Sequence, residues 1–288
     1  MPDPLSSLLT ALDLTDTGAR TSEDIFTGPS QWQPEGRVFG GQVLAQSLIA
    51  AGRTVDDDHG VHSMHGYFLR PGDVTLPITF SVDRIHDGRS FSTRRTQAYQ
   101  NGVPILSMIA SFQTEDEGLD HQTPMPEGVP EPESLPSAAE VLGGIDHPVG
   151  NFWATQRPFD VRHVEQPVYL RADPGRSAQQ SVWMRALGTL PDDPMLHRAA
   201  LAYASDYTIL ESTLRRHGAA WITPGLRIAS LDHAMWWHRP SRVDEWLLYV
   251  QEAPSASGGR GLSLGRIYSR DGALVASVAQ EGMVRVPR

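Results

Sequence analysis

The feature that most constrains the fold is an internal repeat. Arg70-Pro71 in HSMHGYFLRPGD matches Arg239-Pro240 in LDHAMWWHRPSR at an offset of 169 residues. Asn101-Gly102 likewise matches Asp271-Gly272 at an offset of 170 residues. A slip of one residue over that distance is what a single bulge or loop insertion produces. The chain of 288 residues is therefore predicted to contain two copies of one folding unit.

Each copy reads as one long helix and an antiparallel meander. β-Branched and aromatic residues mark strands at about 62–70, 77–86, 90–100 and 103–113, then 164–171, 179–187, 227–238, 245–253, 261–269 and 273–285. Asp87-Gly88 and Asn101-Gly102 are strong hairpin signals between them. One helix can cover the apolar face of such a sheet, and joining the two sheets edge to edge would remove exposed edges.

The predicted fold class is therefore α+β with two similar domains. We place the N-terminal domain at residues 1–115 and the C-terminal domain at 161–288. Residues 116–160 are rich in proline and acidic side chains, which is typical of a linker that crosses the surface.

The clearest helix runs from Asp193 to Gly218, and two others are expected at 3–14 and 37–52. Asp193 suits the N-cap, and Gly218 supplies a stop signal. Its apolar side chains recur at helical spacing, but the position three after Tyr203 on that stripe is Asp206. A carboxylate on the inward face is costly unless it is paired, so Asp206 is either a boundary residue or a base whose ionisation is set by burial.

Composition excludes several classes of protein. A net charge of −10 argues against general binding to nucleic acid or anionic membranes. The absence of cysteine excludes disulfides, thiolate metal sites and a cysteine nucleophile, and it suits a reducing cytoplasm. The N-terminal sequence lacks a basic region before its apolar residues, and no apolar run approaches the roughly 18–20 residues of a membrane span.

The sequence resembles a known family. The stretches RVFGGQVLAQSL, HSMHGYFLRPGD, DGRSFSTRR, YASD, SLDHAMWWHRP and VASVAQEG resemble the bacterial acyl-CoA thioesterase II family, in order and over nearly the whole chain. The resemblance implies a double hotdog fold and hydrolysis of fatty acyl-CoA to the free acid and CoA. It also implies that no cofactor is bound and that the protein forms a homo-oligomer, either a dimer or a tetramer.

The resemblance also assigns a catalytic set. The family's acid corresponds to Asp206, its hydroxyl residue to Ser230 and its glutamine to Gln280. Many bacterial relatives have threonine where this chain has Ser230. The chemistry is consistent with these assignments: a carboxylate can take a proton from attacking water, and a hydroxyl and an amide can fix that water's orientation.

Four further residues are candidates for accessory roles. The backbone amides of Gly40, Gly41 and Gln42 are candidate donors to the oxyanion. His65 is a candidate because histidine titrates near neutral pH, although a structural histidine on a strand is the favoured interpretation. His62 and His65 do not predict a metal site, since residues three apart on a strand face opposite sides.

A basic cluster is the candidate contact for the phosphates of CoA. Arg89, Arg94 and Arg95 lie close together in an acidic chain, and the planar guanidinium suits phosphate. The alternative interpretation is that they are ordinary solvated strand residues that pair with carboxylates.

Three alternatives to hydrolysis by an Asp206-activated water differ in what they require of the sequence. Gly261-Leu-Ser263-Leu-Gly265 fits the serine-hydrolase pattern, but the residues after Ser263 read as strand, turn and strand instead of a helix. An enoyl-CoA hydratase would have a histidine soon after the acid, whereas the first one after Asp206 is His217. A non-hydrolytic protein that binds acyl-CoA or regulates in response to it remains open, because fold alone does not define function.

Overall fold

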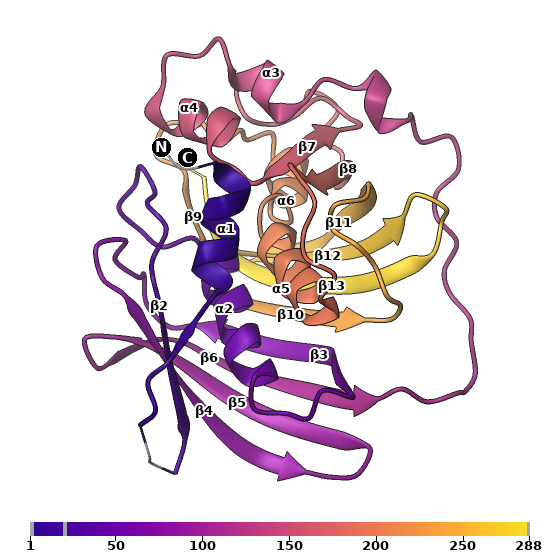
Figure 1. Cartoon of the computed structure of the whole chain (residues 1–288). Helices are drawn as coiled ribbons and strands as arrows, with labels where there is room; N and C mark the ends of the chain where they lie inside the picture. Colours follow the sequence, from indigo (N-terminus) through magenta and orange to yellow (C-terminus); the bar gives the residue numbers. More distant parts are fainter. Residues whose placement is uncertain (1–2, 20–21, 287–288) are drawn as a thin grey trace.

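The computed structural model describes residues 3–19 and 22–286. Within them, one continuous antiparallel sheet of 13 strands spans both halves of the chain (Figure 1). In spatial order its strands are β1 (Thr15–Asp16), β2 (Asp24–Gly28), β4 (Ile78–Asp87), β5 (Phe91–Gln100), β6 (Val103–Thr114), β3 (His59–Phe68), β10 (Asp232–Trp237), β13 (Leu274–Arg285), β12 (Arg260–Ser269), β11 (Leu247–Ser257), β8 (Gln179–Ala186) and β7 (Phe159–His163), and β9 (Arg227–Ser230) also pairs with β13.

The two halves of the sheet meet at strands β3 and β10. These strands are antiparallel, and Met64 of β3 lies opposite Met235 of β10. Both methionines are fully buried, so the junction is part of the hydrophobic core. The predicted edge-to-edge joining of the two sheets is confirmed.

Two central helices cover the same face of this sheet. Figure 1 shows α2 (Gly40–Gly52) and α5 (Pro194–Ser205) side by side at the middle of the molecule. A Cβ atom on Gly41 would collide with the carbonyl oxygen of Tyr203, and one on Gly52 would meet Met195. The start of α2 therefore lies against the end of α5, and glycine permits this close antiparallel approach.

The predicted helix 193–218 is wrong in one respect, because it is interrupted. It ends at Ser205, residues 206–210 form turns, and α6 (Glu211–Arg216) follows. Within the interruption, the amide of Tyr207 bonds to the carbonyl of Ala204 at 3.1 Å, which is a tighter spacing than that of an α-helix. Asp206 is consequently the C-cap of α5 instead of an interior residue.

The prediction of a strand at 164–171 is also wrong. The strand in this region is β7, which ends at His163, and the residues after it are irregular. Pro167 lies in the predicted range, and proline lacks the amide hydrogen that a sheet interior requires.

The segment expected to be a linker contains ordered structure. Residues 115–137 run along the outside of the C-terminal half-sheet, where Arg270 pairs with Glu131 at 2.6 Å and with Glu133 at 2.8 Å (Figure 1). The chain then forms α3 (Ala138–Leu142) and α4 (Pro148–Thr155), preceded by a 3₁₀ turn, η1 (Pro132–Ser134). Residues 148–157 therefore pack over the core and do more than connect the two halves.

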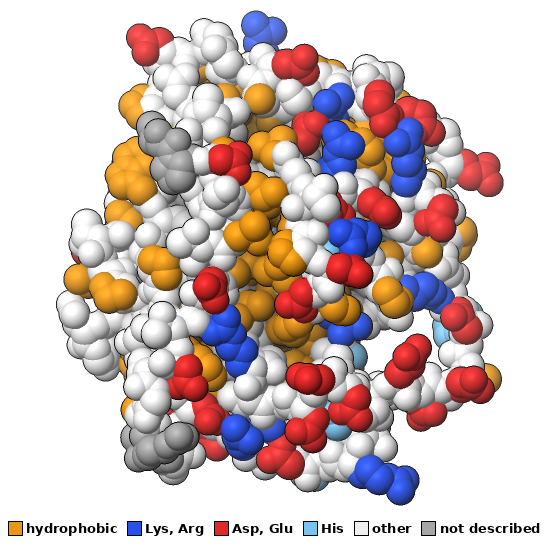
Figure 2. Space-filling view, viewed as in Figure 1, with side chains coloured by type: hydrophobic (Ala, Val, Ile, Leu, Met, Phe, Trp, Pro, Cys, Tyr) orange, Lys and Arg blue, Asp and Glu red, His pale blue; other side chains and the backbone are white. Residues whose placement is uncertain are grey.

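The remaining helix, α1 (Pro4–Leu12), packs on α2. In the space-filling view, apolar side chains gather over the region of α1, α2 and α5, and acidic side chains are spread along the lower margin of the same face (Figure 2). No helix in the described part of the chain is long and apolar enough to cross a membrane.

Candidate active site

The structure brings together three side chains that lie far apart in the sequence. Gln280 Nε2 donates a hydrogen bond to Asp206 Oδ1 at 2.9 Å and another to Ser230 Oγ at 2.8 Å. Ser230 Oγ in turn donates to Asp206 Oδ1 at 3.2 Å. The three residues predicted from the resemblance therefore form one closed hydrogen-bonded triangle.

A bulge in the sheet brings Ser230 to this triangle. Ser230 lies opposite Gly282 of β13, and Ala234 lies opposite Ala279. The chain advances four residues from Ser230 to Ala234 but only three along β13 from Gly282 to Ala279. One extra residue is therefore accommodated near Leu231. Bulges redirect side chains and are common beside functional sites.

Asp206 lies at a polar junction between the two central helices. Burial raises the pKa of Asp206 to about 6, although hydrogen bonds from Gln280, Ser230 and the Gly41 amide act in the opposite direction. The Gly41 amide belongs to the first turn of α2, where backbone N–H groups lack partners within the helix and favour negative charge. A Cβ atom on Gly40 would lie 2.7 Å from Asp206 Oδ2, so the second carboxylate oxygen faces that glycine.

A cavity of about 470 Å³ opens onto this triangle. Asp206, Ser230 and Gly40 line it, whereas Gln280 is fully buried behind them. Most of the remaining wall is apolar or aromatic. These wall residues are Pro34, Val38, Phe39, Val43, Phe68, Leu69, Pro71, Ile105, Val149, Phe152, Trp153, Tyr203, Tyr207, Leu210, Trp221, Ile228, Ala229 and Leu231. The arrangement places a carboxylate of raised pKa at the side of a largely apolar pocket.

His233, which is not predicted from the sequence, contacts the triangle from behind. It lies on β10, is fully buried, and its Nδ1 is hydrogen-bonded to Gln280 Oε1. Burial lowers the pKa of His233 to about 4, so its imidazole is neutral at pH 7. A neutral imidazole has one donor and one acceptor, which fixes the direction of each bond.

The direction of these bonds can be deduced. Because Gln280 donates from Nε2 to two oxygens, its Oε1 must accept from His233 Nδ1–H. His233 Nε2 is then an acceptor, and Ser205 Oγ lies 3.0 Å from it. The directed chain of donors therefore runs from His233 through Gln280 to the Asp206 carboxylate, since the single hydroxyl proton of Ser205 is shared between His233 Nε2 and the Ala202 carbonyl at 2.9 Å. No sequence pattern marks His233, since its role depends on neighbours from other elements.

Two predicted accessory residues lie outside this arrangement. His65 is exposed on β3 and packs edge-on against Trp236, with ring centroids 5.1 Å apart, and it does not line the cavity. The Gln42 amide bonds to the carbonyl of Phe39 at 3.1 Å, so it is not free to bind an oxyanion. The Gly41 amide is directed at Asp206. Of the predicted amide donors, Gly40 is the one that lines the cavity.

The predicted arginine cluster is also remote from the cavity. Arg94 is 1% exposed, its guanidinium donates to Thr54 and Asp87, and it cannot reach a substrate phosphate. Arg95 pairs with Asp83 at 3.0 Å on the neighbouring strand. Neither of these, nor Arg89, lines the cavity, whereas Arg37 and Arg70 are exposed and do line it.

Ser263 does not have the geometry of a serine nucleophile. It lies within β12, is fully buried, and its Oγ contacts the hydroxyls of Ser212 at 3.1 Å and Thr213 at 3.2 Å. It does not line the cavity, and no strand-to-helix turn carries it.

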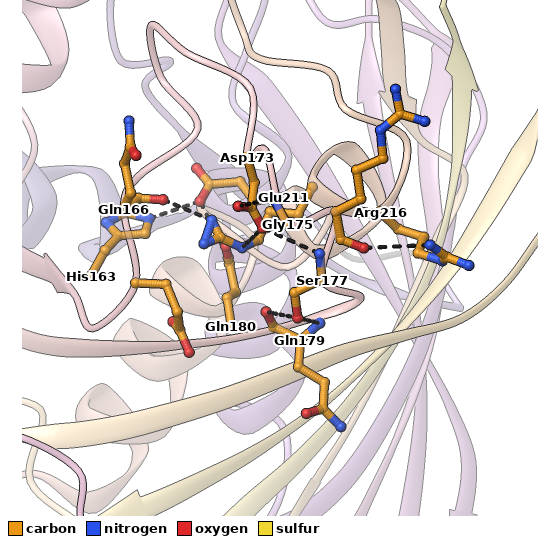
Figure 3. Close-up of polar contacts among 12 residues, drawn as sticks. His163, Gln166, Asp173, Gly175, Ser177, Gln179, Gln180, Glu211 and Arg216 are labelled. Carbon is orange, nitrogen blue, oxygen red and sulfur yellow. Dashed lines mark hydrogen bonds and ion pairs between the residues drawn. The ribbon is translucent and has the colours of Figure 1, made fainter.

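A second buried polar cluster supports one wall of the cavity (Figure 3). The Glu211 carboxylate is bonded to His163 Nε2 at 2.8 Å and accepts from Gln180 Nε2 at 3.2 Å. Its other oxygen accepts from Trp221 Nε1 at 2.9 Å, and Trp221 lines the cavity. Burial is the largest single influence and would raise the pKa of Glu211, but the charge and hydrogen bond of His163, together with hydrogen bonds from Trp221 and Gln180, outweigh it and the pKa is lowered. Glu211 thereby fixes the position of an aromatic wall residue.

Comparisons with known proteins identify the family. The family model described as "Acyl-CoA thioesterase" matches residues 154–283, and the one described as "Acyl-CoA thioesterase N-terminal domain" matches residues 28–113. The chain is 36% identical to acyl-CoA thioesterase 2 of Haemophilus influenzae over 99% of both chains. The chain belongs to the acyl-CoA thioesterase family. The predicted enzyme class, a thioester hydrolase acting on acyl-CoA, is confirmed.

Solved structures of this thioesterase family and fold agree with the architecture. The crystal structure of acyl-CoA thioesterase II TesB2 from Mycobacterium marinum matches with a TM-score of 0.79 and 44% identity, over 97% of this chain and 98% of that one. A hot dog fold protein of unknown function from Alicyclobacillus acidocaldarius matches with a TM-score of 0.79 over 98% and 99% of the two chains, at 20% identity. The predicted double hotdog fold of this thioesterase is confirmed.

Proposed function

We propose that the protein hydrolyses fatty acyl-CoA by direct attack of water on the thioester, with Asp206 as the general base. The observation that carries this proposal is the position of Asp206, which lines the cavity with a pKa raised to about 6. A base with a pKa near the working pH is both ionised and basic enough to accept a proton.

In the proposed reaction, a water molecule beside Asp206 attacks the thioester carbonyl carbon. Asp206 takes one proton from the water as the new C–O bond forms, and the carbonyl π electrons move to oxygen. Collapse of this tetrahedral intermediate breaks the C–S bond, and the thiolate of CoA leaves and acquires a proton. The products are one carboxylic acid and one thiol, so no oxidant, metal or covalent enzyme intermediate is needed.

The neighbours of Asp206 have separate roles in this proposal. Ser230 and Gln280 hold Asp206 Oδ1, which restricts the carboxylate and the attacking water to one orientation. The Gly40 amide, at the start of α2 and on the cavity wall, stabilises the oxyanion. The exposed guanidinium groups of Arg37 and Arg70, on the same wall, bind the phosphates of CoA.

The decisive experiment is a thiol-release assay on acyl-CoA esters with saturated chains of different lengths. We expect free CoA to appear in proportion to free acid, with a maximum at one range of chain lengths. Tight binding of acyl-CoA without release of thiol would instead support the non-hydrolytic alternative. Addition of water to enoyl-CoA with no thiol release would support the hydratase alternative.

We also propose that the protein acts as a homo-oligomer, a dimer or a tetramer, in cytoplasmic lipid metabolism. An apolar strip on the outer face of the sheet supports oligomerisation, since Tyr67 of β3 is 62% exposed and Ile109 of β6 is 47% exposed. Light scattering is expected to give a mass at least twice that of the chain, and Ile109→Glu to lower it. A wild-type monomer would contradict this proposal. The lack of cysteine suits a reducing compartment, which cell fractionation would test.

A further inference from the structure

The wall of the cavity contains a buried arginine that forms no ion pair with another residue in the described part of the chain. Arg157 is 8% exposed and lines the cavity. Its guanidinium carbon lies 4.3 Å from the ring centroid of Trp153 and 4.6 Å from that of Tyr207. These two aromatic faces attract the cation, but neither accepts the in-plane hydrogen bonds that a guanidinium can donate.

Part of the hydrogen-bonding capacity of Arg157 is also unused. Among the described residues, Arg157 Nη1 has no hydrogen-bond partner, and none of the ion pairs includes Arg157. The buried hydroxyls of Tyr169 and Tyr207 have no well-formed hydrogen bond, although that of Tyr169 interacts with Arg157 and that of Tyr207 with Tyr203. Burial raises the pKa of both tyrosines, so both remain hydrogen-bond donors at neutral pH. A buried charge and unsatisfied buried donors are costly unless an acceptor arrives from outside the protein.

Arg157 and Asp206 face the same cavity at separate places. Tyr207 follows Asp206 in the chain, and its ring lies against the guanidinium. The pKa of Asp206 is set by burial and by hydrogen bonds from Gln280, Ser230 and Gly41, without a contribution from Arg157. The two groups are therefore neighbours in the cavity wall without being an ion pair, and one substrate can contact both.

We propose that Arg157 binds an anionic oxygen group at the far end of the acyl chain, so that the site accepts ω-carboxyacyl-CoA esters as well as simple acyl-CoA esters. The planar guanidinium matches a carboxylate, and Tyr207 adds a further donor. The aromatic surroundings of Arg157 suit a carboxylate carried on a methylene chain. The phosphates of CoA are larger and more strongly hydrated, and the exposed Arg37 and Arg70 suit them better. This inference rests on the proposed hydrolysis at Asp206.

The test compares pairs of CoA esters that have the same number of carbons and end either in a methyl group or in a carboxylate. For each pair, kcat/KM is measured by thiol release, and the ratio of carboxylate to methyl substrate is followed as the chain is lengthened. In the wild type we expect the ratio to peak at the length that spans Asp206 and Arg157. Arg157→Met is expected to lower that peak by about tenfold to a hundredfold, with little change for the methyl substrates.

Two matched variants complete the design. Arg157→Gln keeps hydrogen-bonding atoms but removes the charge, so it is expected to lower the peak ratio of carboxylate to methyl substrate. If Arg157→Met does not fold, Arg157→Gln replaces it in the test. Arg37→Met, at the exposed part of the cavity wall, is expected to leave the ratio unchanged. Pantetheine thioesters, which lack the nucleotide phosphates, are expected to show the same dependence on Arg157 as the CoA esters.

Each other outcome is decisive. If Arg157→Met impairs methyl and carboxylate CoA esters equally but has no effect on pantetheine esters, the ligand of Arg157 is a CoA phosphate and the proposal is overturned. An equal loss on all substrates together with a lower Tm would show a structural role and overturn it. Hydrolysis of methyl esters without any length-dependent preference overturns this inference alone, whereas no thiol release from any ester overturns the proposed function as well.

Discussion

Gln280 donates a hydrogen bond from Nε2 to Oδ1 of Asp206 at 2.9 Å, across 74 positions of sequence. This bond ties the last strand of the sheet to the end of the central helix of the C-terminal half. It uses one oxygen of the carboxylate and leaves the other facing Gly40 and the cavity. The consequences of this relationship can be measured in solution.

The first prediction concerns the carboxylate itself. Asp206→Asn is expected to lower kcat for thiol release by about 10²- to 10⁴-fold, the usual contribution of a general base. Since the amide removes a buried carboxylate, the Tm at pH 8 is expected to equal or exceed that of the wild type. Thiol release and thermal unfolding of both proteins test this prediction, and wild-type turnover in the variant would show that Asp206 is not the base.

The second prediction concerns pH. Because the base must be ionised, kcat/KM is expected to fall about tenfold per pH unit below about pH 6, the pKa of Asp206. The stability of the fold depends on pH in the opposite direction to activity. Because the pKa of Asp206 is higher in the folded protein than in the unfolded chain, its contribution to stability is present at low pH and is lost as the pH rises from about 4 to about 6. The difference in Tm between wild type and Asp206→Asn should therefore change across this window. A flat rate profile between pH 5 and pH 8 would contradict the assignment.

The third prediction concerns His233, which fixes the orientation of Gln280. In His233→Leu the amide of Gln280 is free to rotate, so Asp206 loses donors and its pKa rises. We expect kcat to fall about tenfold or more, KM to change little, and the acid limb of the pH profile to move to higher pH. Ser205→Ala, one step further from the carboxylate, is the matched control and should have a smaller effect on all three quantities. An unchanged acid limb in His233→Leu would mean that the histidine only fills space.

The fourth prediction compares the paired glycines at the start of α2. In Gly40→Ala the new Cβ lies 2.7 Å from Asp206 Oδ2 and 3.1 Å from the Phe68 ring, so side chains must shift and the carboxylate is displaced. Activity is expected to fall at least tenfold while the Tm changes little. In Gly41→Ala the collision is with the backbone oxygen of Tyr203, which cannot move independently, so unfolding by heat or urea should reveal a large loss of stability. Equal stability losses in the two variants would contradict this distinction.

The fifth prediction concerns the serine-hydrolase pattern. Ser263→Ala removes a buried hydroxyl that contacts only Ser212 and Thr213 among the described side chains. We expect turnover within about twofold of the wild type and a loss of stability of about 1 kcal/mol, as for one buried hydrogen bond. A thousandfold loss of turnover in a folded protein would make Ser263 the nucleophile after all.

The sequence by itself determined the duplicated architecture, because the signals for it are local. Turn residues at Asn101-Gly102 and Asp271-Gly272, and the strands that flank them, act over a few residues and recur at nearly the same offset. The carboxylate of Asp206 was also identified from its own helix, since a charge on an apolar stripe is visible in sequence. Ser230 and Gln280 were placed by resemblance to a family, because no local pattern links them to Asp206.

Only the tertiary structure decided which side chains meet. The predicted basic cluster does not form one surface, because the side chain of Arg94 is buried and donates hydrogen bonds to Thr54 and Asp87. Arg157, in a segment expected to be a linker, instead became part of the cavity wall. His233 gained its contact with Gln280 only because their strands, β10 and β13, are adjacent in the sheet. Periodicity fixes which face of an element is buried, but burial, pKa and hydrogen-bond direction depend on neighbours that come from distant parts of the chain.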